Sequence, residues 1–401
     1  MSRIDRRRVR RYAAGPLCLL ACAGMYFGAR ALSDTLFHAA LEAAEETVPQ
    51  VREGESRFNA LSLREQRLYD VICDAMEARD TETARVSFAP TAQEFQDAFY
   101  AVLYDHPLYC DVIPRDCRLQ TTRYSGVITL AYEAEGEQMR QTLEARAASL
   151  CAALTQGGAD SRRMLLDLHA ALTDLCMPAA SDAAGAADTA YDALIGGCAD
   201  GFGYALAFSL LCETVGIACD VVTGEAAAEG IASPHAWNAV TLDGVTGYTD
   251  VMWNDAPVSG EDDALLSFHG YYHLSLDEMA YDHTPDGTLP LSGGDTVNYY
   301  EAADACITDA DSLAPALQRI LSDARASGDD CAELYLSPTL VLTDYQLEEH
   351  LQTAIAAANA VIFDGDVPKL RAVNRIYHAA QAPGAVTVRL FYEEEPSSGD
   401  N

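Results

Sequence analysis

Residues 193–224 read ALIGGCADGFGYALAFSLLCETVGIACDVVTG, and they decide the fold together with SPHAWNAVTLDG at 233–244 and YTDVMWND at 248–255. The first stretch predicts a glycine-rich turn, then an apolar helix and a strand. The other two predict paired strands that carry a histidine and an aspartate. A helix packed on an antiparallel sheet predicts an α+β fold.

The hairpin register is predicted to bring His235 and Asp250 together. Strands over 235–242 and 245–253 are joined by Asp-Gly at 243–244, a favourable two-residue turn. That turn makes Asp250 the diagonal neighbour of His235 on one face of the sheet. A carboxylate there can orient the imidazole. A cysteine at the start of the preceding helix would complete a Cys-His-Asp triad, because the helix dipole favours thiolate and the histidine serves as base.

These motifs resemble the transglutaminase-like superfamily, which has a papain-like fold. In that family G-x-x-C-x-G-Y-A supplies the nucleophilic cysteine, HAWN the histidine and D-x-x-W-x-D the aspartate. GYALAF, HAWN and DVMWND match at compatible spacing, and flanking stretches extend the resemblance to about residues 60–310, as in exported bacterial members. The resemblance implies a triad containing His235 and Asp250. The residues expected around its pocket are Tyr204, Trp237, Asn238 and Trp253.

The sequence departs from the family at the nucleophile. Counting back from the Gly-Tyr-Ala that begins at Gly203 places the family cysteine at Gly201, which has no side chain to attack a carbonyl. Cys198, three residues upstream, is an alternative nucleophile only if the turn is rebuilt, at a large loss of rate. Three functions stay open: a catalytically degenerate module that binds a peptide or cell-wall ligand or acts as a scaffold, a thiol amide hydrolase or transferase using Cys198, and a stalk or adhesion protein.

Apolar periodicity predicts helices and strands on both sides of the core. The expected helices span 61–79, 91–103, 137–156, 161–176, 312–326 and 344–360, and the expected strands lie within 121–133, over 332–342 and over 385–392. This organisation predicts five parts. They are a basic tip with an anchor or signal (1–32), a stalk (33–58), a helical and β region (59–180), the transglutaminase-like core (181–310) and a small α/β segment (311–401).

The N-terminus predicts export. Six arginines and one aspartate give the first twelve residues a net charge of +5, and an uncharged stretch follows from Tyr12 to Ala29. This pattern favours a single-pass anchor with a cytoplasmic N-terminus. A signal peptide cut after Ala31 and a lipoprotein signal ending at Cys22 are the alternatives, and all three place the body outside the cytoplasm.

The composition excludes several classes of partner. The chain has 401 residues and a formal net charge of -35, so the residues after the first twelve carry -40 and are expected to repel nucleic acid and anionic lipid.

No cysteine pair has CxxC spacing, and the spacing of His269, His273 and His283 fits no standard site, so no metal and no cofactor are expected. These three histidines are interpreted as surface or sheet residues. Cys110 and Cys117 are candidates for a disulfide that closes a short loop.

Overall fold

The computed structural model describes residues 51–155, 158–179, 187–228, 230–255, 268–287, 296, 298–329, 331–337, 340, 342–363, 367–377 and 385–393. This part of the chain is α+β, as the sequence predicts. It divides into two compact units: Met1–Val102 with Ile113–Tyr132, and Leu103–Val112 with Glu133–Asn401. The division into five predicted parts stays a prediction.

The predicted anchor, Tyr12 to Ala29, lies outside the described residues. Among the helices that are described, none combines the length and the apolar character needed to cross a bilayer.

The ten cysteines of the described residues are all free, and they include the proposed disulfide partners Cys110 and Cys117.

The first unit combines helices with a small hairpin. Helix α3 begins at a capping box in which the Ser62 side chain accepts from the Glu65 N–H and the Glu65 carboxylate accepts from the Ser62 N–H. The predicted helices over 61–79 and 91–103 are confirmed. The elements are α2 (Ser56–Ala60), α3 (Leu63–Ala78), α4 (Ala92–Asp105), the 3₁₀ helix η1 (Pro114–Asp116), β1 (Arg118–Thr121) and β2 (Gly126–Thr129).

The second unit is built around helix α7 (Gly201–Thr214) and a four-stranded antiparallel sheet of order β7-β6-β5-β8. The strands are β5 (Ala218–Ala228), β6 (Ile231–Leu242), β7 (Val245–Thr249) and β8 (His283–Pro285). Around them lie α5 (Gly136–Thr155), α6 (Ser161–Leu175), β3 (Met177–Pro178), the π-helix η3 (Asp192–Gly196), β4 (Cys198–Ala199), α8 (Val251–Asn254), α9 (Leu276–Met279) and α10 (Tyr299–Ala302).

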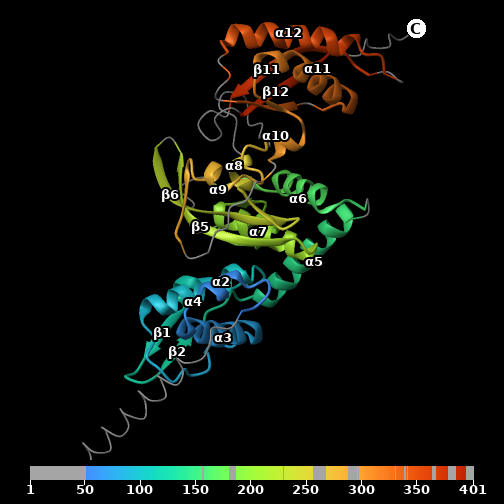
Figure 1. The fold of residues 1–401 in the computed structure, drawn as a ribbon. Helices are drawn as coiled ribbons and strands as arrows, with labels where there is room; N and C mark the ends of the chain where they lie inside the picture. The colour runs from blue at the N-terminus through green and yellow to red at the C-terminus, as the bar shows by residue number, and fades with distance from the viewer. Residues whose placement is uncertain are drawn as a thin grey trace, which may run out of the picture. The chain divides into compact units, whose positions relative to one another are not determined.

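Helix α7 is the core of this unit, and it contacts strands β5 and β6 as well as helices α5 and α6 (Figure 1). Its sequence, GFGYALAFSLLCET, is apolar on every side, which is typical of a helix enclosed by other elements. Residues Gly203 through Cys212 are all buried. The apolar helix that the sequence predicts is therefore the element on which the sheet and the neighbouring helices pack.

Gly224 allows strand β8 to pair closely with β5. It faces Pro285 across the two strands, and a Cβ on it would lie 2.2 Å from the Thr284 carbonyl oxygen and 2.9 Å from the ring of Trp237. Any side chain at this position would push β8 away from the sheet. Because β8 begins with His283, this close approach also determines where that histidine lies.

The C-terminal part of the second unit is a second four-stranded sheet, of order β11-β12-β10-β9, with helices α11 and α12 packed on each other and on its strands (Figure 1). The predicted helices and the last strand are confirmed, but the strand predicted over 332–342 ends at Leu336, and β9 and β11 were not predicted. The elements are β9 (Cys306–Ile307), α11 (Ala310–Ser327), β10 (Cys331–Leu336), α12 (Asp344–Ala360), β11 (Leu370–Tyr377) and β12 (Ala385–Tyr392).

Candidate functional site

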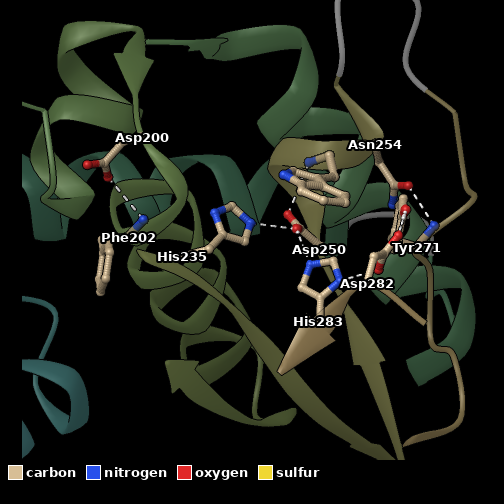
Figure 2. A network of polar contacts seen from close by, with 9 residues as sticks. Asp200, Phe202, His235, Asp250, Asn254, Tyr271, Asp282 and His283 are labelled. Atoms are coloured by element: carbon tan, nitrogen blue, oxygen red, sulfur yellow. Dashed lines mark hydrogen bonds and ion pairs between the residues drawn. The ribbon is translucent and has the colours of Figure 1, made fainter. Parts of the chain in front are cut away.

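The candidate site begins at the N-terminus of helix α7. The Asp200 side chain caps this helix, and its Oδ1 accepts hydrogen bonds from the N–H groups of Phe202 at 3.0 Å and Gly203 at 3.1 Å (Figure 2). The cap satisfies two of the donors that a helix start leaves without intrahelical partners. It therefore fixes the position of Gly201, the residue that stands where the resemblance of the sequence motifs implies a cysteine.

The imidazole of His235 occupies the space into which a side chain at Gly201 would project. A Cβ added to Gly201 would lie 2.3 Å from His235 Nδ1 and 2.4 Å from its Cε1. Both residues are buried. The site therefore has no room for a thiol at position 201 unless the imidazole moves.

His235 and Asp250 are brought together as the sequence predicts. Nε2 of His235 lies 2.6 Å from Oδ2 of Asp250, and the pair Leu242–Val245 beside the turn confirms the predicted hairpin register. The predicted strand over 245–253 is too long. Strand β7 ends at Thr249, and Asp250 instead caps the short helix α8, accepting a hydrogen bond from the Trp253 N–H at 3.0 Å.

His283 is a member of the site that sequence reasoning missed. Its Nε2 lies 3.1 Å from Oδ2 of Asp250 and its Nδ1 lies 2.6 Å from Oδ1 of Asp282. The Tyr271 hydroxyl donates to the other oxygen of Asp282 at 2.5 Å (Figure 2). His283 does lie in a sheet, but it is buried and not on the surface. The sequence shows His283 directly after Asp282, but this neighbour alone does not predict a contact with the distant Asp250.

Electrostatics favours ionised Asp250 and protonated His283. Burial alone would raise the pKa of Asp250, but the two histidines, His235 above all, lower it well below its ordinary value. Burial alone would lower the pKa of His283, but hydrogen bonds to Asp250 and Asp282 raise it above its ordinary value. Both shifts favour the charged form of the group.

His269 and His273 lie outside this cluster, and neither is a surface residue. His269 is partly buried, with Nδ1 2.9 Å from Oε1 of Glu333 and its ring stacked on Tyr299 at a centroid distance of 3.9 Å. His273 is buried, and its ring fills the space beside Gly247. The interpretation of these two histidines as surface or sheet residues is wrong, because each packs in the interior outside a strand.

The residues expected around the pocket join the three motifs to one another. Tyr204 donates its hydroxyl to Asp255 Oδ2 at 2.6 Å, and the Asn238 amide donates to the Ala205 carbonyl at 2.9 Å. Both bonds are buried. Tyr204 and Asn238 therefore connect the N-terminal half of α7 to the motif that carries Asp250 and to the motif that carries His235. Buried hydrogen bonds of this kind rigidify a site.

The two tryptophans enclose the histidines. Trp237 is 2% exposed and packs edge-on against His283 at a centroid distance of 4.9 Å. Trp253 is 9% exposed, and its centroid lies 4.6 Å from that of His283 and 5.6 Å from that of His235. These rings form an apolar wall around the ionic cluster.

Cys198, the alternative nucleophile, is not bonded to the histidine. It is exposed and lies in β4, which pairs in parallel with Met177 of β3. Within the described residues, no hydrogen bond joins its sulfur to His235. The structure therefore brings together His235, Asp250 and Gly201, but it does not join Cys198 to them.

No protein-family model matches the chain, and no curated protein does. A solved structure reported as the crystal structure of a TGase aligns at 13% identity over 37% of this chain and 46% of that chain, with a TM-score of 0.26. A putative cysteine protease from Cytophaga hutchinsonii aligns at 12% identity over 32% of this chain and 51% of that chain, with a TM-score of 0.24. This chain spans about half the length of each structure, so the candidate function rests on the site itself.

The contact between Gly201 and His235 predicts strong energetic coupling. Gly201→Ala is expected to destabilise the protein by about 1–3 kcal/mol, because the added methyl displaces an imidazole held by Asp250. In a His235→Ala background the same change should be close to neutral or stabilising, since alanine is the better helix former. Urea unfolding of all four proteins measures this coupling.

Gly196→Ala is the matched control for this cycle, because an added Cβ there meets only the Tyr191 carbonyl oxygen, at 4.0 Å. An equal cost of Gly201→Ala in both backgrounds would show that the imidazole does not occupy this space in solution.

Asp255 predicts a pH-dependent stability. Burial raises the pKa of Asp255 to about 7, above the ordinary 3.8 of the unfolded chain. Folding therefore binds a proton between these values, and its stabilising effect is lost as the pH rises from about 4 to 7. Asp255→Asn keeps an acceptor for Tyr204, so the variant should match the parent near pH 4 and exceed it by roughly 1–3 kcal/mol at pH 8.

Denaturant midpoints across this range measure the difference, and Asp74→Asn on the exposed side of α3 is the control. A constant difference between Asp255→Asn and the parent at all pH values would contradict the assignment.

Proposed function

We propose that this chain is a transglutaminase-like module without thiol catalysis, whose remnant site binds a peptide or cell-wall ligand or acts as a scaffold. The observation that carries the proposal is the His235 ring in the space of a side chain at Gly201. A thiolate must lie beside its base, with a free path to the substrate carbonyl. Here the base itself fills that position.

The resemblance of three motifs to the transglutaminase-like superfamily supports the class, and their mutual hydrogen bonds are consistent with it. Placement outside the cytoplasm through an N-terminal anchor is part of the proposal and rests on the sequence of residues 1–32. A peptide or wall-linked ligand is favoured over nucleic acid because the body of the protein is strongly acidic.

The second candidate is a thiol enzyme acting through Cys198, which is favoured by the exposure of this cysteine one turn before the helix. The two candidates differ in what His235 does to the thiol. In a Cys-His pair the histidine raises the thiolate fraction and thereby the rate of alkylation. In the proposed module Cys198 and His235 act independently.

Alkylation by iodoacetamide distinguishes these candidates. Cys198 is expected to react at the rate of an ordinary exposed thiol, with a change of less than about twofold in His235→Ala, because no hydrogen bond joins the two residues in the described part of the chain. Mass spectrometry of chymotryptic peptides measures the rate at Cys198, because trypsin leaves residues 164–319 uncut, and buried Cys151 provides the internal slow control. Fast labelling of Cys198 that disappears in His235→Ala would establish the thiol enzyme instead.

Tryptophan fluorescence can detect a ligand at the site. Trp237 and Trp253 are the only tryptophans of the chain, and both lie against His283. A soluble peptidoglycan stem peptide that binds in the remnant site is therefore expected to change the emission saturably, and Trp253→Phe should remove most of the change. An emission that does not respond, compared with an unrelated peptide as control, would argue for the scaffold role.

A further inference from the structure

Three ligand-type atoms converge in the buried site. Nε2 of His235, Oδ2 of Asp250 and Nε2 of His283 all lie within 4.8 Å of one another. Their side chains are 8%, 1% and 0% exposed. Two imidazole nitrogens and one carboxylate oxygen form a donor set that Zn²⁺ and related ions favour.

Two buried carboxylates converge on this cluster. Both nitrogens of His283 face carboxylate oxygens, those of Asp250 on one side and Asp282 on the other. Nε2 of His235 faces Asp250, and its Nδ1 lies against the N-terminus of α7. The cluster therefore combines two carboxylate side chains with two imidazole rings.

A divalent cation would compensate both carboxylates. Nε2 of His235 and Nε2 of His283 would each offer a lone pair to the ion. Buried charges are retained in proteins when they are paired or bind a metal, because an uncompensated charge in the interior is costly. The burial of Asp250 and Asp282, at 1% and 5% exposed, makes this argument strong here.

The surroundings of His283 also fit a metal ligand. Its Nδ1 donates to Asp282, which in turn accepts from the Tyr271 hydroxyl (Figure 2). Metal-binding histidines commonly donate their second N–H to a carboxylate in this way, which fixes the ring and raises its basicity. Asp282 and Tyr271 also line a cavity of about 220 Å³ beside the cluster.

The distances require only a small adjustment. Metal–ligand bonds of zinc are about 2.0–2.1 Å, so ligand atoms in a tetrahedral site lie about 3.3 Å apart. The present separations from Asp250 Oδ2 are 2.6 Å to His235 and 3.1 Å to His283, and the two histidine nitrogens lie within 4.8 Å of each other. Opening the first pair and bringing the two nitrogens closer together can be achieved by side-chain rotation.

We propose that His235, Asp250 and His283 bind one divalent transition-metal ion, with Zn²⁺ as the preferred ion. Asp282 positions His283 for this role, and the fourth coordination position is left for water or an exogenous ligand. The proposal goes beyond the function proposed above and does not depend on it, because ion binding requires neither a peptide ligand nor the absence of a reactive thiol.

Zinc binding to the tag-free full chain tests this site. After removal of metal with a chelator, the protein is titrated with Zn²⁺ in competition with a chromophoric chelator, and with Mg²⁺ as the comparison ion. We expect one equivalent of Zn²⁺ at micromolar affinity or tighter, and no competition from Mg²⁺. Asp282→Asn should weaken zinc binding by about 10- to 100-fold, the range for changes in the outer shell, and His283→Gln should weaken it further.

Two controls separate this site from other donors. His350→Gln, on α12, and Cys198→Ser, which removes the exposed thiol, should leave the affinity unchanged. Co²⁺ bound to the unmodified chain should give the visible d–d absorption of a four- or five-coordinate ion, a readout that does not depend on any variant folding. Failure to take up stoichiometric Zn²⁺, or an affinity that Asp282→Asn and His283→Gln leave unchanged, would overturn the proposal.

Discussion

The carboxylate of Asp250 is the constraint on which the site depends. It accepts hydrogen bonds from His235 on β6, from His283 on β8 and from the Trp253 N–H in α8. Strands β6 and β8 are not neighbours in the sheet, because β5 lies between them. One buried carboxylate therefore connects two separated strands and the first turn of a helix, and its ionisation is maintained by the imidazoles that it orients.

The absence of a side chain at position 201 has a structural consequence as well as a chemical one. An imidazole that acts as the base of a cysteine at this position must leave space for the thiol between its ring and the helix. With glycine at this position, the His235 ring lies against the backbone of α7 while keeping its bond to Asp250. The histidine is thereby a packed component of the interior, with Nε2 directed at Asp250.

Local signals predicted most of the helices and the hairpin, but not the full site. Helix α12 follows from its apolar periodicity, and the His235–Asp250 pair follows from a two-residue turn that fixes the register. His283 could not be found in this way. It lies 33 residues beyond Asp250 in a three-residue strand, and its position depends on the close approach that Gly224 permits between β5 and β8. Such packing across the sheet leaves no periodic pattern in the sequence.

Asp250 and Asp255 show that burial alone does not decide the chemistry of this region. Both belong to one motif, both are 1% exposed, and burial acts on both to raise the pKa. Asp250 faces two imidazoles and stays ionised, whereas Asp255 faces the Tyr204 phenol, which donates a hydrogen bond but brings no positive charge. The two aspartates therefore act differently: Asp250 is an anionic acceptor at the start of α8, and Asp255 is a proton-binding group at its end. This difference keeps the charged carboxylate of the motif on the side where the histidines converge.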